Sequence, residues 1–86
     1  MIQKVYAVFR DRTGTMKFYS NLIKYKVLCK VVNTPKELGS KCGVSVIFSF
    51  SDLAKAKHCL NSTKYSTFVN FYLLEIVNNF KKFKVV

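Results

Sequence analysis

The amino-acid sequence predicts an α+β fold in which two helices cover one face of an antiparallel sheet. Two patterns carry this prediction. Several short segments alternate apolar and polar residues with a period of two, and two segments between them have apolar residues at helical spacing. The segments follow the order strand, helix, strand, strand, helix, strand. This is the order of the ferredoxin-like βαββαβ arrangement, whose sheet has four antiparallel strands.

The first half of the chain supplies a strand, a helix and a second strand. Residues 4–10 are rich in β-branched and aromatic side chains, which predicts the first strand. Apolar residues recur at helical spacing from 15 to about 26, which predicts the first helix. The candidate N-caps of this helix are Asp11, Thr13 and Thr15. Residues 27–32 then predict the second strand, which Pro35 prevents from continuing.

The second half repeats a strand, a helix and a strand. Residues 44–50 alternate with a period of two, so we expect a strand with one face on the core. A helix over residues 53 to about 60 follows. Its candidate N-caps are Ser51 and Asp52. Residues 67–75 predict the fourth strand, although residues 72–83 also have a helical pattern, and the conformation of residues 75–86 stays open.

The predicted arrangement leaves one face of the sheet uncovered. This face is expected to carry Tyr6, Val8 and Ile47. In so small a protein, an uncovered apolar face indicates a protein partner, a second copy of the chain in a homodimer, or single-stranded nucleic acid.

Length and composition indicate one small globular domain over residues 1–86. Half of the residues are hydrophobic, yet no apolar run approaches the roughly 18 residues that cross a bilayer. The N-terminus has no signal-peptide pattern. The three cysteines lack CxxC spacing, which argues for thiols in a reducing compartment. We therefore expect a cytoplasmic protein.

The chain is strongly basic. Fifteen basic residues against four acidic ones give a net charge of +11, and thirteen of the fifteen are lysines spread along the whole length. Such a charge attracts polyanions and acidic surfaces. We expect a protein partner, keep nucleic acid as a further candidate, and expect no membrane.

The segment NTPKELGSKCG at residues 33–43 contains the sharpest candidate site. It lies between two predicted strands, and Cys42 stands where the chain enters the second of them. Lys36 and Lys41 are close enough in sequence to stabilise a thiolate by their charge. Gly43 permits a tight turn that a partner can approach. The alternative is that Cys42 is a small buried residue at the start of a strand.

Three other residues of this segment are expected to support its shape. Pro35 and Thr34 shape the turn, and Thr34 is a candidate cap for the KEL residues that follow. Glu37 is expected to hold the loop through a hydrogen bond or to pair with a lysine.

The sequence gives little support to metal binding, carboxylate catalysis or phosphate binding by a loop. Cys29 and Cys59 lie inside a predicted strand and a predicted helix, and with His58 they lack the spacing of zinc ligands. The chain has four carboxylates in all and no glycine-rich phosphate loop. We expect no metal, no cofactor and no enzymatic activity beyond that of a thiol carrier.

The segment from Thr34 to Gly43 resembles the signature of the Se/S carrier protein-like family, a group of small bacterial proteins. That signature is a TPRE-type tetrapeptide followed shortly by Cys-Gly and a β-strand. The matching residues are Thr34, Pro35, Glu37, Cys42 and Gly43, whereas Lys36 replaces an arginine and Gly39 a common serine. The similarity extends over nearly the whole chain.

The resemblance implies a carrier that holds sulfur or selenium on the thiol of Cys42. Its partners would be the proteins that donate and accept that atom. The alternative function is a binding module for RNA or protein that uses the basic surface. Against it, the segment GVSVIFSF lacks the basic-glycine-aromatic pattern of common RNA-binding sheets.

Overall fold

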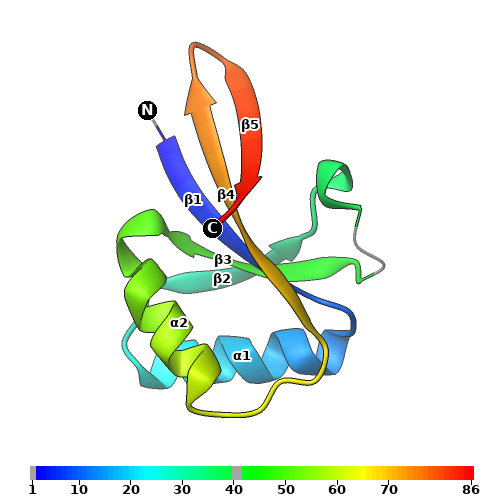
Figure 1. Cartoon of the computed structure of the whole chain (residues 1–86), viewed down its shortest axis with the longest axis vertical. Coiled ribbons are helices and arrows are strands. Elements are labelled where there is room, and N and C mark those ends of the chain that lie inside the picture. Colours follow the sequence, from blue (N-terminus) through cyan, green and yellow to red (C-terminus); the bar gives the residue numbers. More distant parts are fainter. Residues whose placement is uncertain (1, 40–41) are drawn as a thin grey trace.

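A computed structural model of the chain describes residues 2–39 and 42–86. In these ranges the chain forms two helices and a five-stranded antiparallel sheet with the order β2-β3-β1-β4-β5 (Figure 1). The elements are β1 (Ile2–Phe9), α1 (Arg12–Lys24), β2 (Cys29–Asn33), the short 3-10 turn η1 (Lys36–Leu38), β3 (Val44–Ser49), the 3-10 turn η2 (Phe50–Asp52), α2 (Leu53–Asn61), β4 (Phe68–Val77) and β5 (Phe80–Val85). The predicted α+β class is confirmed.

The prediction of four strands is wrong, because the C-terminal residues form a fifth. β5 pairs antiparallel with β4 from Tyr72 opposite Val85 to Val77 opposite Phe80. Asn78 and Asn79 join the two strands with φ angles of 50° and 67°. Two-residue hairpin turns of type I′ need positive φ at both positions, and asparagine tolerates it. The ferredoxin-like arrangement is therefore not fully matched.

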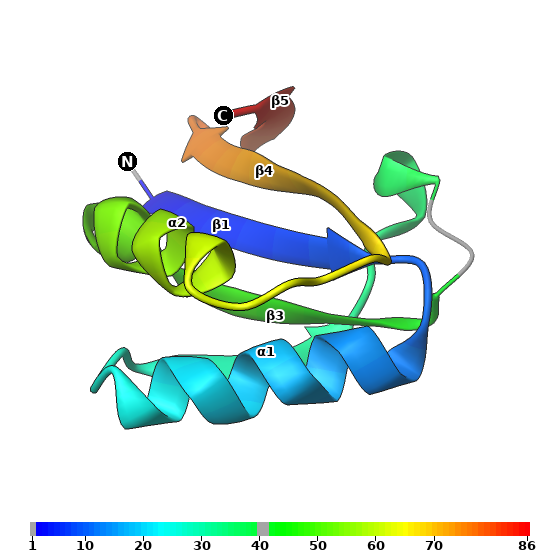
Figure 2. The ribbon, with the colours of Figure 1, turned by 60° about the horizontal axis from the view of Figure 1, so that its bottom comes forward.

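Both helices pack on the same face of the sheet (Figure 2). Along β1, alternate side chains point toward the helices, as expected for a strand with one face on the core. The buried core contains Val5, Ala7, Phe9, Phe18, Leu22, Val27, Val46, Phe48, Ala56, Cys59, Phe71 and Leu73. Aromatic rings occupy its centre, with Phe18 lying 5.4 Å from Phe9 between ring centroids.

The first helix begins earlier than its apolar pattern indicates. Asp11 is the N-cap, and its Oδ1 accepts hydrogen bonds from the Gly14 backbone N at 2.8 Å and from Thr67 Oγ1 at 3.1 Å. A side chain at Gly14 would meet this cluster, because a Cβ there would lie 2.5 Å from Thr67 Oγ1. The start of α1 thus depends on a contact with the segment that leads into β4.

Replacing Gly14 by alanine is expected to destabilise the protein by roughly 1–3 kcal/mol, because the Asp11 and Thr67 contacts must move apart. Gly43→Ala is the matched control, since no atom lies within 4 Å of a Cβ built there. We expect that variant to remain within about 0.5 kcal/mol of the parent. Urea denaturation of both variants measures the difference. Equal stability of the two would show that the cap cluster does not position α1.

The side of the sheet opposite the helices, here named the open face, is partly covered by the chain itself. Val8 is only 1% exposed, so its expected place on an uncovered surface is wrong. The segment with η1 lies on this side (Figure 2), and Thr34 Oγ1 is 2.5 Å from the Oγ of the buried Ser45. Tyr6 and Ile47 are half-buried. The periodicity of β1 could not show that a loop 25 residues away folds over one end of this face.

Candidate functional site

Cys42 lies just before β3, with its sulfur against the N-terminal part of α1. Its side chain is buried, with 7% exposure. The Sγ atom donates to the Val44 carbonyl oxygen at 3.3 Å and lies 3.7 Å from Thr15 Oγ1. The sulfur therefore lies among oxygen atoms at the junction of β3 and α1.

Thr15 belongs to this site although nothing in the sequence indicated it in that role. Its side chain is fully buried, and its hydroxyl donates to the Asp11 carbonyl oxygen at 3.1 Å. The Thr15 hydroxyl also lies 3.5 Å from the Val44 carbonyl oxygen, to which Cys42 donates. A hydroxyl can donate or accept, so Thr15 is able to donate to the sulfur when Cys42 loses its proton.

The ends of the signature segment are tied together by its backbone. The Thr34 N–H donates to the Gly43 carbonyl oxygen at 3.0 Å, and the Leu38 N–H donates to the Pro35 carbonyl oxygen at 3.1 Å. The KEL residues form η1, but its N-cap is Pro35, so the prediction that Thr34 caps this turn is wrong. The Thr34 side chain contacts Ser45 instead. The two ends of the segment are therefore held together next to Cys42.

Gly39 ends η1 in the left-handed region, at φ 60°. This is a conformation that glycine adopts without steric cost. A residue with a side chain would be less favourable here.

Two charged residues of the segment, Lys36 and Glu37, are exposed. Lys36 and Glu37 lie in η1, and Lys41 is outside the described residues. Burial raises the pKa of the Tyr6 hydroxyl, and the nearby Glu37 carboxylate raises it further. Within residues 2–39 and 42–86, the ion pair found joins Lys84 to Glu75 at 3.5 Å, so the expected pairing of Glu37 with a lysine is not seen there.

A family model described as "Putative Se/S carrier protein-like" matches residues 4–69. The chain belongs to this family. The match contains the whole signature segment and all three cysteines, and it ends inside β4. Neither the curated proteins nor the solved structures gave a match.

The other two cysteines of this Se/S carrier protein-like chain have apolar surroundings. Cys59 is fully buried in the core, and Cys29 packs against it from β2. Burial raises the pKa of both thiols, and the neighbouring Cys59 sulfur raises that of Cys29 further. All three cysteines are thiols. Cys29 and Cys59 therefore serve packing, and the sulfur in polar surroundings is that of Cys42.

Residues 2–39 and 42–86 contain no group of three histidine, cysteine or acidic side chains that could hold a metal ion. In the same ranges, none of the helices is both long and apolar enough to span a membrane.

Proposed function

We propose that the protein carries sulfur or selenium on Cys42 and passes it between two partner proteins. The observation that supports this most is the contrast between the cysteines. The Cys42 sulfur contacts the Val44 carbonyl and lies near the Thr15 hydroxyl, whereas Cys59 lies in the apolar core and Cys29 packs against that core. The family match adds the signature around Cys42. The protein would act as a carrier and not as an enzyme.

Loading is a thiolate exchange that needs no metal and no oxidant. The Cys42 thiolate attacks the outer sulfur of a donor persulfide, R–S–SH. A new S–S bond forms on Cys42, the S–S bond of the donor breaks, and the electron pair leaves on the donor thiolate. Unloading is the same step with the acceptor nucleophile attacking the outer atom. A donor R–S–SeH would deliver selenium in the same way.

The surroundings of Cys42 suit each state of this cycle. In the thiol form the Sγ proton is donated to the Val44 carbonyl oxygen. In the thiolate form the hydroxyl of Thr15 can turn from the Asp11 carbonyl oxygen to donate to the sulfur. A hydrogen bond donated to a thiolate stabilises the charged form. The small exposed part of Cys42 is where a donor would have to reach.

The test is the rate at which each cysteine is modified in the folded protein between pH 6 and pH 10. Iodoacetamide and glutathione persulfide are the two probes, and mass spectrometry of peptides identifies the site. We expect Cys42 to react roughly ten-fold or more faster than Cys59 at neutral pH, because reactivity follows thiolate character and access. The raised pKa of Cys29 and of Cys59 delays their modification to a pH above that of an ordinary thiol.

The same reaction in 6 M guanidinium chloride is the control, since all three thiols should then react at similar rates. Protection of Cys42 to the same degree as Cys59 in the folded protein would mean that the signature has an architectural role. Faster reaction of Cys29 than of Cys42 would indicate that Cys29, and not Cys42, is the carrier thiol.

A further inference from the structure

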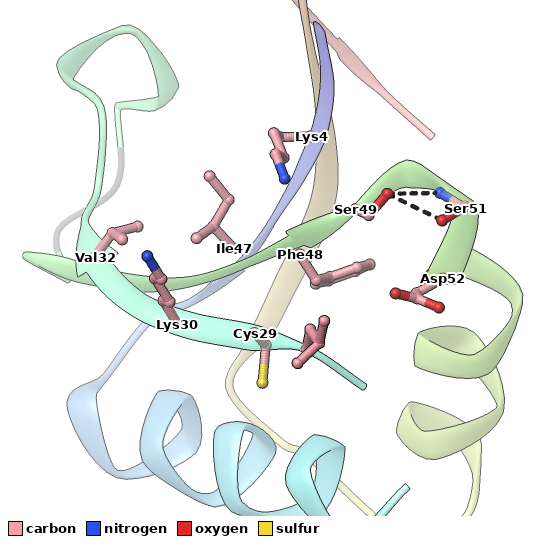
Figure 3. A pocket seen from close by; sticks show the side chains of 10 residues that line it. Lys4, Cys29, Lys30, Val32, Ile47, Phe48, Ser49, Ser51 and Asp52 are labelled. Carbon is pink, nitrogen blue, oxygen red and sulfur yellow. Dashed lines mark hydrogen bonds between the residues drawn. The ribbon is translucent and has the colours of Figure 1, made fainter. Parts of the chain in front are cut away.

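A groove of about 700 Å³, which the proposed carrier chemistry does not use, extends from the open face to the sheet edge at η2, where Leu28, Cys29, Phe48, Ser51 and Asp52 also line it. Figure 3 shows its lining, in which Lys4, Lys30, Val32 and Ile47 come from three neighbouring strands. Val32 and Ile47 make an apolar floor, and both lysines are exposed. The Cys29 sulfur points to the other side of β2 from Lys30.

Aromatic side chains occupy the part of the open face next to the groove. Tyr6 pairs with Ile47 of the groove on one side and with Tyr72 on the other, and paired residues of neighbouring strands share a face. The Phe83 ring from β5 lies 6.2 Å from the Tyr6 ring between centroids. All three rings are half-buried. The open face thus joins an apolar groove to a row of rings.

The charges near this face favour a polyanion. Lys4 and Lys30 flank the groove, and the register places Lys81 on the same face of β5. A second copy docking through this face would bring these lysines together in a chain whose net charge is +11. A polyanion that also carries flat apolar groups would pair its charges with the lysines and stack its flat groups on the rings.

We propose that the open face binds single-stranded nucleic acid, with a base in the groove and its phosphates against Lys4 and Lys30. Neighbouring bases stack on Tyr6 and Phe83. Stacking accepts any base because each has a π-face, and lysines attract phosphate without regard to sequence. The binding is therefore expected to have little sequence preference.

Two acidic side chains near the groove repel phosphates and so limit where the phosphates bind. Asp52 lines the end of the groove at η2, and the Glu37 charge acts on Tyr6 at the other side. The phosphates are held between them, beside Lys4 and Lys30. Two residues of the proposed binding face, Lys81 and Phe83, lie in β5. The family match ends at residue 69, so it does not cover this strand.

The test is fluorescence anisotropy of a labelled 12-nucleotide poly-U RNA at 50 and 150 mM salt, with the full chain. The double variant Lys4→Ala/Lys30→Ala should bind about ten-fold more weakly and lower the salt slope by about 0.7 for each lost phosphate contact. Lys55→Ala/Lys57→Ala removes the same charge from the exposed side of α2. It should change the affinity less than about two-fold.

The ring contribution is measured separately with Tyr6→Leu/Phe83→Leu, which keeps the apolar volume and should weaken binding several-fold. Circular dichroism confirms that each variant is folded, and Cys42→Ser should bind RNA as the parent does, so a failure of the carrier function leaves this test intact. No binding at 150 mM salt would overturn the proposal. So would equal weakening by the two lysine pairs, no effect of the ring variant, or stronger competition by polyglutamate than by RNA.

Discussion

Replacing Cys42 by serine is expected to abolish sulfur transfer while the fold survives. A serine hydroxyl cannot form a persulfide, so transfer from a donor persulfide should fall at least about 100-fold. The fold should lose no more than about 1 kcal/mol, because the hydroxyl can donate to the Val44 carbonyl oxygen as the thiol does. Mass spectrometry of the protein after exposure to glutathione persulfide measures transfer, and urea denaturation measures stability.

The matched variants are Cys29→Ser and Cys59→Ser. Both should keep transfer at Cys42, since Cys59 lies in the apolar core and Cys29 packs against that core. Cys59→Ser should cost about 1–3 kcal/mol, because it places a hydroxyl in the apolar core. Transfer that survives in Cys42→Ser, or that disappears in Cys29→Ser, would contradict the assignment of the carrier thiol.

Thr15→Val extends this prediction to the neighbour of the sulfur. The variant keeps the shape of the side chain and removes the hydroxyl that lies 3.7 Å from Cys42 Sγ. Because this hydroxyl can donate to the thiolate, its loss should slow the reaction of Cys42 with iodoacetamide several-fold at neutral pH, while Cys29 and Cys59 behave as before. An unchanged rate at Cys42 would restrict Thr15 to a structural role.

Replacing Phe18 by alanine is expected to cause the largest loss of stability of any change considered. The ring is fully buried, and its centroid lies 5.4 Å from that of Phe9, 5.5 Å from Tyr65 and 6.1 Å from Phe71. Truncation of such a residue costs about 3–5 kcal/mol through lost transfer energy and the cavity left behind. Small domains have only about 5–15 kcal/mol in total, so the variant should be close to unfolding.

Met16→Ala in the same helix is the control. Met16 is 38% exposed, and alanine has the higher helix propensity, so its change should stay within about 1 kcal/mol. Thermal denaturation followed by circular dichroism compares the two. A loss for Met16→Ala as large as that for Phe18→Ala would mean that α1 packs through a different side.

Local patterns in the sequence predicted the elements that have a clear period. The alternation at 44–50 became β3, and the helical spacing after Asp11 became α1, with Asp11 among the expected caps. The segment with Cys42 was found because its residue types and spacing are local. The Asn78-Asn79 pair that ends β4 was also a local signal, and attention to it would have predicted the hairpin.

The sequence by itself determined the α+β class, the family and the place of Cys42 in the chain. Only the tertiary structure decided that Thr15 lies beside Cys42, that η1 folds over one end of the open face, and that Tyr6 and Phe83 share that face. Periodicity and turn residues act over a few positions, so a single sequence reports them directly. Contacts between separate elements, such as that between Thr15 and Cys42 across 27 positions, depend on how the elements pack, which only the folded chain shows.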